Sequence, residues 1–241
     1  MALVMVAAPA IGQQPAKAGR TYVIVQGAWG SSSTWQTVDS MLTAQGHEVH
    51  RIPLTGLGQR VHLASPQISL ETHINDVVNA VLWDNLRDIV LVGYSYGGMV
   101  VTGAASRISD RVSRLIYVDA ILPEPGESVV DIMPPAFIES VRANTRDGFV
   151  VPVWQKDTVV VPRDLPQPLK TFTDSVHFDA ARVAAIPSTY ILTYVAGGPP
   201  DAFERFALRA SKLGMHVVRI VGDHTPHRSQ PKHLVELLVG N

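Results

Sequence analysis

The sequence contains no cysteine, and this absence excludes thiol catalysis, disulfide bonds and cysteine-ligated metal sites. It also has almost no net charge, because 20 lysines and arginines stand against 21 aspartates and glutamates. The sequence has no basic region that would indicate binding to nucleic acid. It also has no polybasic or amphipathic stretch that would indicate binding to a membrane surface. A small molecule is therefore the expected partner, and the sequence predicts no particular oligomeric state.

The first 19 residues differ in composition from the rest of the chain. Residues 2–8 are apolar, and Ala10-Ile11-Gly12 fits the small-residue rule for cleavage of an export signal, but the positively charged start of such a signal is missing. The apolar stretch is too short to span a bilayer. Two interpretations stay open: an export signal, which predicts a periplasmic or secreted protein, or a disordered apolar tail on a cytoplasmic one.

The length of 241 residues suits a single α/β domain with a substantial core. Apolar, β-branched runs alternate with stretches that carry apolar residues at helical spacing. This alternation predicts a doubly wound, mostly parallel sheet with helices on both faces and a site at the carboxyl ends of the strands. Strands are expected at 21–25, 47–54, 89–92, 114–119, 189–195 and 215–221, and helices at 34–45, 70–82, 96–108, 201–212 and 231–239.

The alternation is interrupted between residues 122 and 187. This segment is rich in proline and offers only short helix candidates, around 136–145 and 170–185, and no comfortable strand. We interpret it as a lid inserted above the site, so that 20–121 and 188–241 form the core. Its aromatic residues favour a hydrophobic ligand, although such residues more often serve packing alone: Phe137, Phe149, Trp154, Phe172 and Phe178.

The stretch around Ser95 is the strongest functional signal in the sequence. A buried-strand pattern over 89–92 leads into Gly93-x-Ser95-x-Gly97, and an apolar helix pattern follows at once. A serine at the tip of such a turn has a strained backbone, so glycines two residues before and after it avoid a clash. The pattern predicts a nucleophile elbow, with the hydroxyl exposed above the sheet and a helix N-terminus behind it.

Serine needs a base within hydrogen-bond reach and a third group that orients the base. Of the nine histidines, only His224 and His227 lie on the loop directly after the last predicted strand, which is where this arrangement places its histidine. We favour His224, because it comes first after the strand and has the acidic neighbour Asp223. Two loop histidines three residues apart are weak evidence for a metal site, so we predict neither a metal nor a cofactor.

Several motifs together resemble the α/β-hydrolase superfamily, from about residue 20 to the end of the chain. The resemblance is greatest to the branch with bacterial carboxylesterases, pyrethroid-hydrolase-like enzymes, salicylate methylesterases and hydroxynitrile lyases. It implies an α/β-hydrolase fold with Ser95 as nucleophile and His224 as general base. The motifs that carry it are Gln-Gly-Ala-Trp at 26–29, Gly-Tyr-Ser-Tyr-Gly-Gly-Met at 93–99, His-x-Pro-x-x-Ser-x-Pro at 224–231, and the stretches 54–58 and 117–128.

The resemblance also implies where negative charge is stabilised. The backbone N–H groups of Ala28 and Tyr96 would form the oxyanion hole, with Gly27 allowing the loop to approach closely. The neighbouring Gln26, Gly27, Trp29 and Tyr94 are expected to contact substrate. Glutamine at position 26 stands where the family usually has histidine, a change that we expect to tune the site, because the donors are backbone groups.

A second departure concerns the acid of the triad. The family places it just after the strand that ends near Val195, and here that position is Ala196. The best substitute is Asp119, at the end of the strand after the elbow helix, since its carboxylate could reach the same histidine. An equally good interpretation is that Asp119 anchors the loop at 123–128.

The leading hypothesis is an esterase that cleaves small-to-medium hydrophobic carboxylic esters through an acyl-enzyme on Ser95. The alternative is a ligand-binding or catalytically impaired homologue, which the missing acid at Ala196 motivates. Cyanohydrin cleavage is a third, weaker hypothesis, because it needs a cation near the serine. Lys156 and Lys170 are the candidates for that cation, and both are expected to be solvated.

Overall fold

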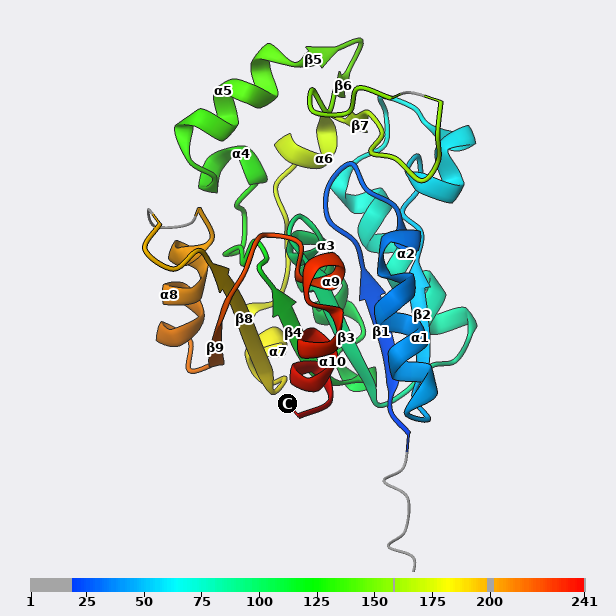
Figure 1. The fold of residues 1–241 in the computed structure, drawn as a ribbon, viewed down its shortest axis with the longest axis vertical. Helices are drawn as coiled ribbons and strands as arrows, with labels where there is room; N and C mark the ends of the chain where they lie inside the picture. Colours follow the sequence, from blue (N-terminus) through cyan, green and yellow to red (C-terminus); the bar gives the residue numbers. More distant parts are fainter. Residues whose placement is uncertain (1–18, 158, 199–201, 241) are drawn as a thin grey trace, which may run out of the picture.

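The computed structural model describes residues 19–157, 159–198 and 202–240. The segment expected to be an export signal or a tail lies, up to residue 18, outside the described residues. Six parallel strands form the central sheet, in the order β2-β1-β3-β4-β8-β9 (Figure 1). The strands are β1 (Thr21–Val25), β2 (Glu48–Ile52), β3 (Ile89–Tyr94), β4 (Val112–Val118), β8 (Ser188–Tyr194) and β9 (His216–Val221).

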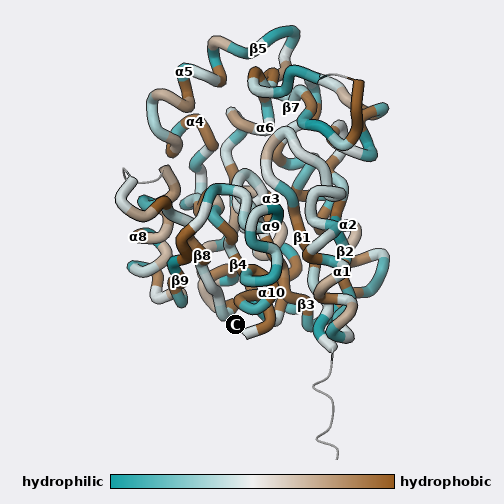
Figure 2. The backbone as a smooth tube through the Cα atoms, in the orientation of Figure 1, coloured by the Kyte–Doolittle hydropathy of each residue, from teal (hydrophilic) through white to brown (hydrophobic). Residues whose placement is uncertain are grey.

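Helices cover both faces of this sheet, which confirms the predicted doubly wound class. On one face Tyr22 and Ile24 of β1 pack with residues of α1 (Gln36–Ala44) and α10 (Pro231–Gly240). The alternate residue Val23 joins the cluster on the other face, since successive side chains of a strand point to opposite sides. The central strands therefore consist almost entirely of apolar residues (Figure 2).

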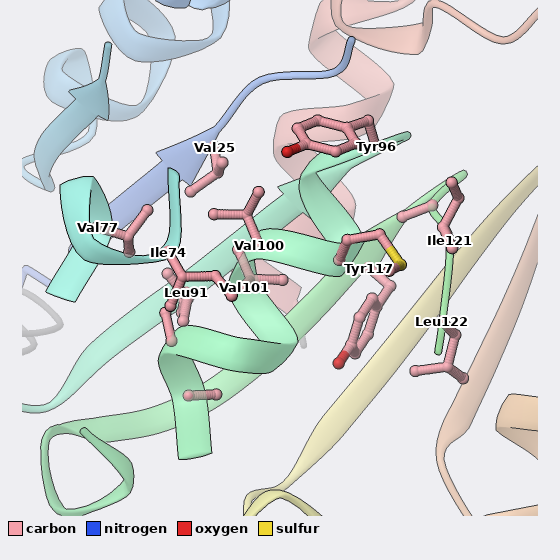
Figure 3. Close-up of a cluster of buried hydrophobic side chains, with 14 of the residues drawn as sticks. Val25, Ile74, Val77, Leu91, Tyr96, Val100, Val101, Tyr117, Ile121 and Leu122 are labelled. Atoms are coloured by element: carbon pink, nitrogen blue, oxygen red, sulfur yellow. The ribbon is translucent and has the colours of Figure 1, made fainter. Parts of the chain in front are cut away.

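The second face is covered mainly by α2 (Leu70–Trp83) and α3 (Gly97–Arg107). Figure 3 shows Val100 and Val101 of α3 among side chains from the sheet and from α2, such as Leu91 and Ile74. Residues 97–106 of α3 are all buried. A helix of small and apolar residues can lie close to the sheet, and this fixes the position of its N-terminus beneath the elbow. The same cluster includes buried residues of α8 (Glu204–Lys212).

The segment 122–187 lies between β4 and β8, and its part from α4 to α6 sits above the carboxyl ends of the central strands, at the top of Figure 1, whereas α7 lies lower, near the start of β8. It contains α4 (Val129–Ile132), α5 (Pro135–Ala143), α6 (Lys170–Thr173) and α7 (Ala180–Ala184). It also contains a small antiparallel sheet of β5 (Thr145–Arg146), β6 (Phe149–Val150) and β7 (Gln167–Pro168). Its action as a lid stays a prediction.

One expectation for this segment was wrong: no strand was expected, and three strands are present. They were not predicted because strands of two residues are too short to show a hydrophobic period. The short helix candidates around 170–185 correspond to α6 and α7, which are separate because the backbone around Val176 pairs elsewhere: Val176 N donates to Glu127 O, and Gly126 N donates to Val176 O. The chain then re-enters a helix at α7, which the Asp179 side chain caps.

The remaining elements are short turns of helix around the core. The loop after β2 continues into the 3₁₀ helix η2 (Gly58–Leu63), and α1 is preceded by η1 (Ser32–Trp35). The others are η3 (Ser109–Arg111) and α9 (Pro226–Ser229). None of the described helices combines the length and the apolar character needed to cross a bilayer.

Candidate active site

Ser95 sits at the tip of a sharp turn between β3 and α3. Its φ of 53° lies in the left-handed region, where a non-glycine residue is strained. Three backbone hydrogen bonds hold it there: Ser95 N donates to Val118 O (3.3 Å), and Ser95 O accepts from Gly98 N (3.1 Å) and Ile121 N (3.0 Å). A Cβ on Gly97 would lie 2.6 Å from Gln26 O, so this position of the motif requires glycine.

His224 lies on the loop after β9, with Nε2 2.9 Å from Ser95 Oγ. Its ring lies between two aromatic rings, stacked on Phe203 (centroids 4.6 Å apart) and tilted against Tyr94 (5.1 Å). The neighbouring Asp223 makes no hydrogen bond with this imidazole. Its Oδ1 instead accepts from Thr225 N (2.7 Å) and from Ser229 Oγ (2.9 Å), which stabilises the turn that carries His224.

Asp119 directly follows β4 and is fully buried, with a φ of 43°. Its Oδ2 lies 2.6 Å from His224 Nδ1, and its Oδ1 accepts from Thr193 N (3.0 Å). The structure thus places at His224 the carboxylate of the β4 strand end, the one named as the substitute for the missing acid at Ala196. The 123–128 loop is held by another residue, because Arg209 pairs with Glu127 (2.6 Å) and donates to Leu122 O (2.8 Å).

The backbone N–H groups of Ala28 and Tyr96 have no hydrogen-bond acceptor among the described residues, and both residues line the same cavity as Ser95. Tyr96 stands at the N-cap of α3, where free N–H groups and the helix dipole favour negative charge. The Tyr96 side chain is fixed by a hydrogen bond between its hydroxyl and His73 Nδ1 (2.9 Å). The two amides are thus available to an oxyanion formed at Ser95.

A model of the alpha/beta hydrolase family matches residues 22–236 of the chain. The chain belongs to this family. The sequence resemblance to it is confirmed, and the match includes the positions of Ser95, Asp119 and His224.

Full-length relatives place this α/β-hydrolase among the ester hydrolases. It is 34% identical over 237 residues to a carbendazim hydrolyzing esterase of Nocardioides sp. (strain SG-4G). The alignment covers 90% of this chain and 97% of the relative. In structure it resembles an extracellular α/β-hydrolase from a Paenibacillus species (TM-score 0.78, 23% identity, 92% and 98% of the two chains). It also resembles an Arabidopsis methylesterase (TM-score 0.68, 23% identity, 92% and 98%).

The loop of the hydrolase that carries Ala28 and Trp29 is held by the inserted segment, through a residue that no sequence motif singles out. Trp29 has a φ of 60°, and its N–H donates to Gln167 Oε1 of β7 (2.7 Å). Trp29 O accepts from Leu165 N (2.8 Å), and the indole N–H donates to Val150 O (3.1 Å). Gln167 is fully buried, so its acceptor helps to define the direction of the adjacent Ala28 amide.

We expect Gln167→Leu to lower kcat for an ester substrate by about tenfold, with little change in KM. The variant leaves the Trp29 N–H unpaired in a partly buried place. It loosens the loop without deleting a donor, so its effect lies below the loss from removing an oxyanion donor. Steady-state kinetics would measure it, with the exposed Gln45→Leu as the matched control. An equal loss in both variants, or a change in KM alone, would contradict this role.

Two cavities meet at Ser95 in the hydrolase. One, of about 410 Å³, extends under the inserted segment and is lined mostly by apolar side chains, Phe137, Trp154 and Phe172 among them. The other, of about 280 Å³, is lined by most of the polar side chains that surround Ser95. Both include Ala28, Trp29, Ser95, Trp154 and His224. We call them the apolar cavity and the polar compartment.

The residues predicted to contact substrate belong mainly to the polar compartment rather than to the apolar cavity. Gln26, Gly27, Trp29 and Tyr94 all line the polar compartment. Phe149 and Phe178, also suggested for the ligand, line neither space. Lys156 and Lys170 are exposed and likewise line neither, so the cation needed by the cyanohydrin hypothesis is not supplied by them.

His227, the other histidine after the last strand, is buried and lines the polar compartment. Its ring stacks on Trp35 with centroids 4.7 Å apart and planes 5° from parallel. Burial first, and then the charge of Arg228, lower the pKa of His227 to about 3. Within residues 19–157, 159–198 and 202–240, no three His, Asp or Glu side chains lie close enough together to hold a metal ion.

Proposed function

We propose that this α/β-hydrolase cleaves small-to-medium hydrophobic carboxylic esters through an acyl-enzyme on Ser95. The observation that carries the proposal is the continuous chain of hydrogen bonds from Ser95 Oγ through His224 (2.9 Å) to Asp119 (2.6 Å). This is the order of nucleophile, base and orienting acid that activates a serine at neutral pH. The proposal names Ser95, His224 and Asp119 as the triad.

The geometry supports a two-step reaction. His224 Nε2 accepts the Ser95 proton as Oγ attacks the ester carbonyl, and Asp119 stabilises the imidazolium through Nδ1–H. The N–H groups of Ala28 and Tyr96 bind the oxyanion of the tetrahedral intermediate. His224 then returns the proton to the leaving alcohol, and a water activated by the same nitrogen hydrolyses the acyl-enzyme and frees Ser95.

The cavities support the proposed size and polarity of the substrate. The apolar cavity, of about 410 Å³, falls within the range of small-molecule sites. Phe137, Phe172 and Phe203 form part of its wall and would favour an aliphatic or aromatic group over a charged one. The likeness to an enzyme named as a carbendazim hydrolyzing esterase further supports ester hydrolysis of a small organic molecule.

The competing hypothesis of an impaired, ligand-binding homologue rested on Ala196. With the Asp119 carboxylate at the orienting nitrogen of His224, this motive loses its force. No other feature of the described site favours a binding protein over an enzyme.

Labelling with a fluorophosphonate probe, followed by peptide mass mapping, tests the proposal. We expect stoichiometric labelling of Ser95, saturable turnover of p-nitrophenyl butyrate, and loss of that turnover in proportion to the labelling. Labelling at another serine would contradict the assignment of the nucleophile. A folded protein that neither reacts with the probe nor turns over the ester would favour the binding homologue.

A further inference from the structure

The polar compartment holds hydrogen-bond donors that have no partner within the protein. Tyr94 Oη, His227 Nε2 and the Arg228 guanidinium make no hydrogen bond or ion pair with any described residue, and all three residues line the compartment. Burial raises the pKa of the Tyr94 phenol, so this hydroxyl stays protonated and can donate. Tyr94 and His227 are buried residues whose donor atoms reach the compartment, whereas Arg228 is exposed. Because no described residue accepts from these donors beside Ser95, they are available to a ligand.

The orientation of His227 determines which of its nitrogens can reach a ligand. Nδ1 is buried and has no partner, whereas Nε2 is not among the buried unpaired atoms and is thus the nitrogen open to the compartment. A buried N–H without an acceptor is rarer in proteins than an acceptor without a donor. This favours the tautomer with the proton on Nε2, and the low pKa keeps the ring neutral. His227 is therefore a neutral donor that faces the compartment.

Most of the other polar atoms of the compartment already make hydrogen bonds within the protein. Thr34 Oγ1 donates to Ser31 O (2.8 Å), Thr225 Oγ1 donates to Asp223 (2.9 Å), and Asp164 Oδ2 accepts from Trp154 Nε1 (2.7 Å). Gln26 Nε2 donates to Gly30 O (2.6 Å), and its Oε1 is a buried acceptor without a hydrogen-bond partner. The groups left for a ligand are mostly donors, so the ligand part that fits is an acceptor.

The position of the compartment indicates which half of an ester it receives. The loop that carries His224 also supplies Thr225, His227 and Arg228 to its wall, whereas the inserted segment supplies much of the wall of the apolar cavity. During acylation the leaving oxygen must lie beside His224 Nε2 to receive its proton. The alcohol half therefore extends along the His224 loop, and the acyl half extends under the inserted segment.

We propose that the polar compartment is a subsite for an alcohol group that carries a neutral hydrogen-bond acceptor, such as an ether oxygen, a carbonyl oxygen or a ring nitrogen. Tyr94 Oη and His227 Nε2 donate to that acceptor, and the apolar cavity holds the acyl chain. This inference rests on the proposed function and refines its substrate class: esters with an apolar acid and an acceptor-bearing alcohol. Arg228 lies at the exposed edge of the subsite.

Matched substrates test the subsite. The 2-methoxyethyl and butyl esters of 3-phenylpropanoic acid have the same number of chain atoms and differ by one ether oxygen. We expect the ratio of their kcat/KM values, methoxyethyl over butyl, to fall by about five- to tenfold in His227→Phe, which keeps a ring against Trp35, and similarly in Tyr94→Phe. A second pair, ethyl methoxyacetate and ethyl butyrate, places the ether on the acid and should show no such fall.

The controls separate donation from packing and from the proposed function itself. His50→Phe, on β2, should leave the ratio unchanged, and Phe137→Leu in the apolar cavity should lower both values by the same factor. An unchanged ratio in folded Tyr94→Phe and His227→Phe, or a fall in the acid pair instead, overturns the subsite. If His227→Phe does not fold, Tyr94→Phe alone decides. Failure of the wild type to hydrolyse either ester would instead refute the proposed function.

Discussion

Ser95→Ala is expected to lower kcat for p-nitrophenyl butyrate by about 10⁶-fold, the scale of nucleophile removal in serine proteases. The loss is this large because the acyl-enzyme cannot form, so His224 and Asp119 have no hydroxyl to activate. What remains is the contribution of the oxyanion N–H groups and of substrate binding. The measurement is kcat at saturating ester, together with the loss of fluorophosphonate labelling.

A matched variant shows whether the loss is specific. Ser211 lies exposed on α8, and its side chain makes no hydrogen bond with the described residues, so Ser211→Ala should retain wild-type turnover. Both variants should melt close to the wild type. Among the described residues, the side-chain hydrogen bond that is lost is the one between Ser95 Oγ and His224 Nε2. Residual turnover in Ser95→Ala above about one-hundredth of wild type would show that another group attacks the ester.

The sequence predicted the core of the fold well, and the reason lies in the burial of the sheet. Strands covered on both faces, such as β3, are continuous apolar runs, and the intervening helices show one apolar stripe. The strands of the inserted segment have two residues each, too few for a local pattern. Their pairing depends on contacts between segments that are distant in the sequence.

The parts of the site were predictable to different degrees for the same reason. Ser95 and its glycines form a local motif, and His224 follows from its place after the last strand. Asp119 had two possible roles, triad acid or anchor of the 123–128 loop. The choice between them depended on β4 and β8 being neighbours in the sheet, which no local sequence pattern shows. Gln167 was missed because its partner Trp29 is 138 residues away in the chain, and no motif links the two.

Asp119→Asn is expected to lower kcat by about 10⁴-fold, as the corresponding change does in a serine protease triad. The structure gives a specific reason. Oδ1 of Asp119 accepts from Thr193 N, so an asparagine would place its carbonyl oxygen there and its NH₂ group toward His224 Nδ1. That nitrogen would then have to accept, which moves the imidazole proton to Nε2 and leaves no base for Ser95. The loss should appear in kcat, with KM nearly unchanged.

The matched control for this prediction is Asp223→Asn, at the acid next to His224 in sequence. Asp223 Oδ1 accepts from Thr225 N, Thr225 Oγ1 and Ser229 Oγ. An asparagine carbonyl can accept from Thr225 N and Oγ1, and Ser229 Oγ can donate to Thr225 O instead. We therefore expect turnover within a fewfold of wild type and a similar melting temperature. If Asp223→Asn lost most of the activity while Asp119→Asn retained it, the orienting acid would be the sequence neighbour of His224 rather than the carboxylate at the end of β4. Equal, small losses in both variants would mean that His224 acts without an orienting acid, because neither substitution would then have changed the tautomer of its ring.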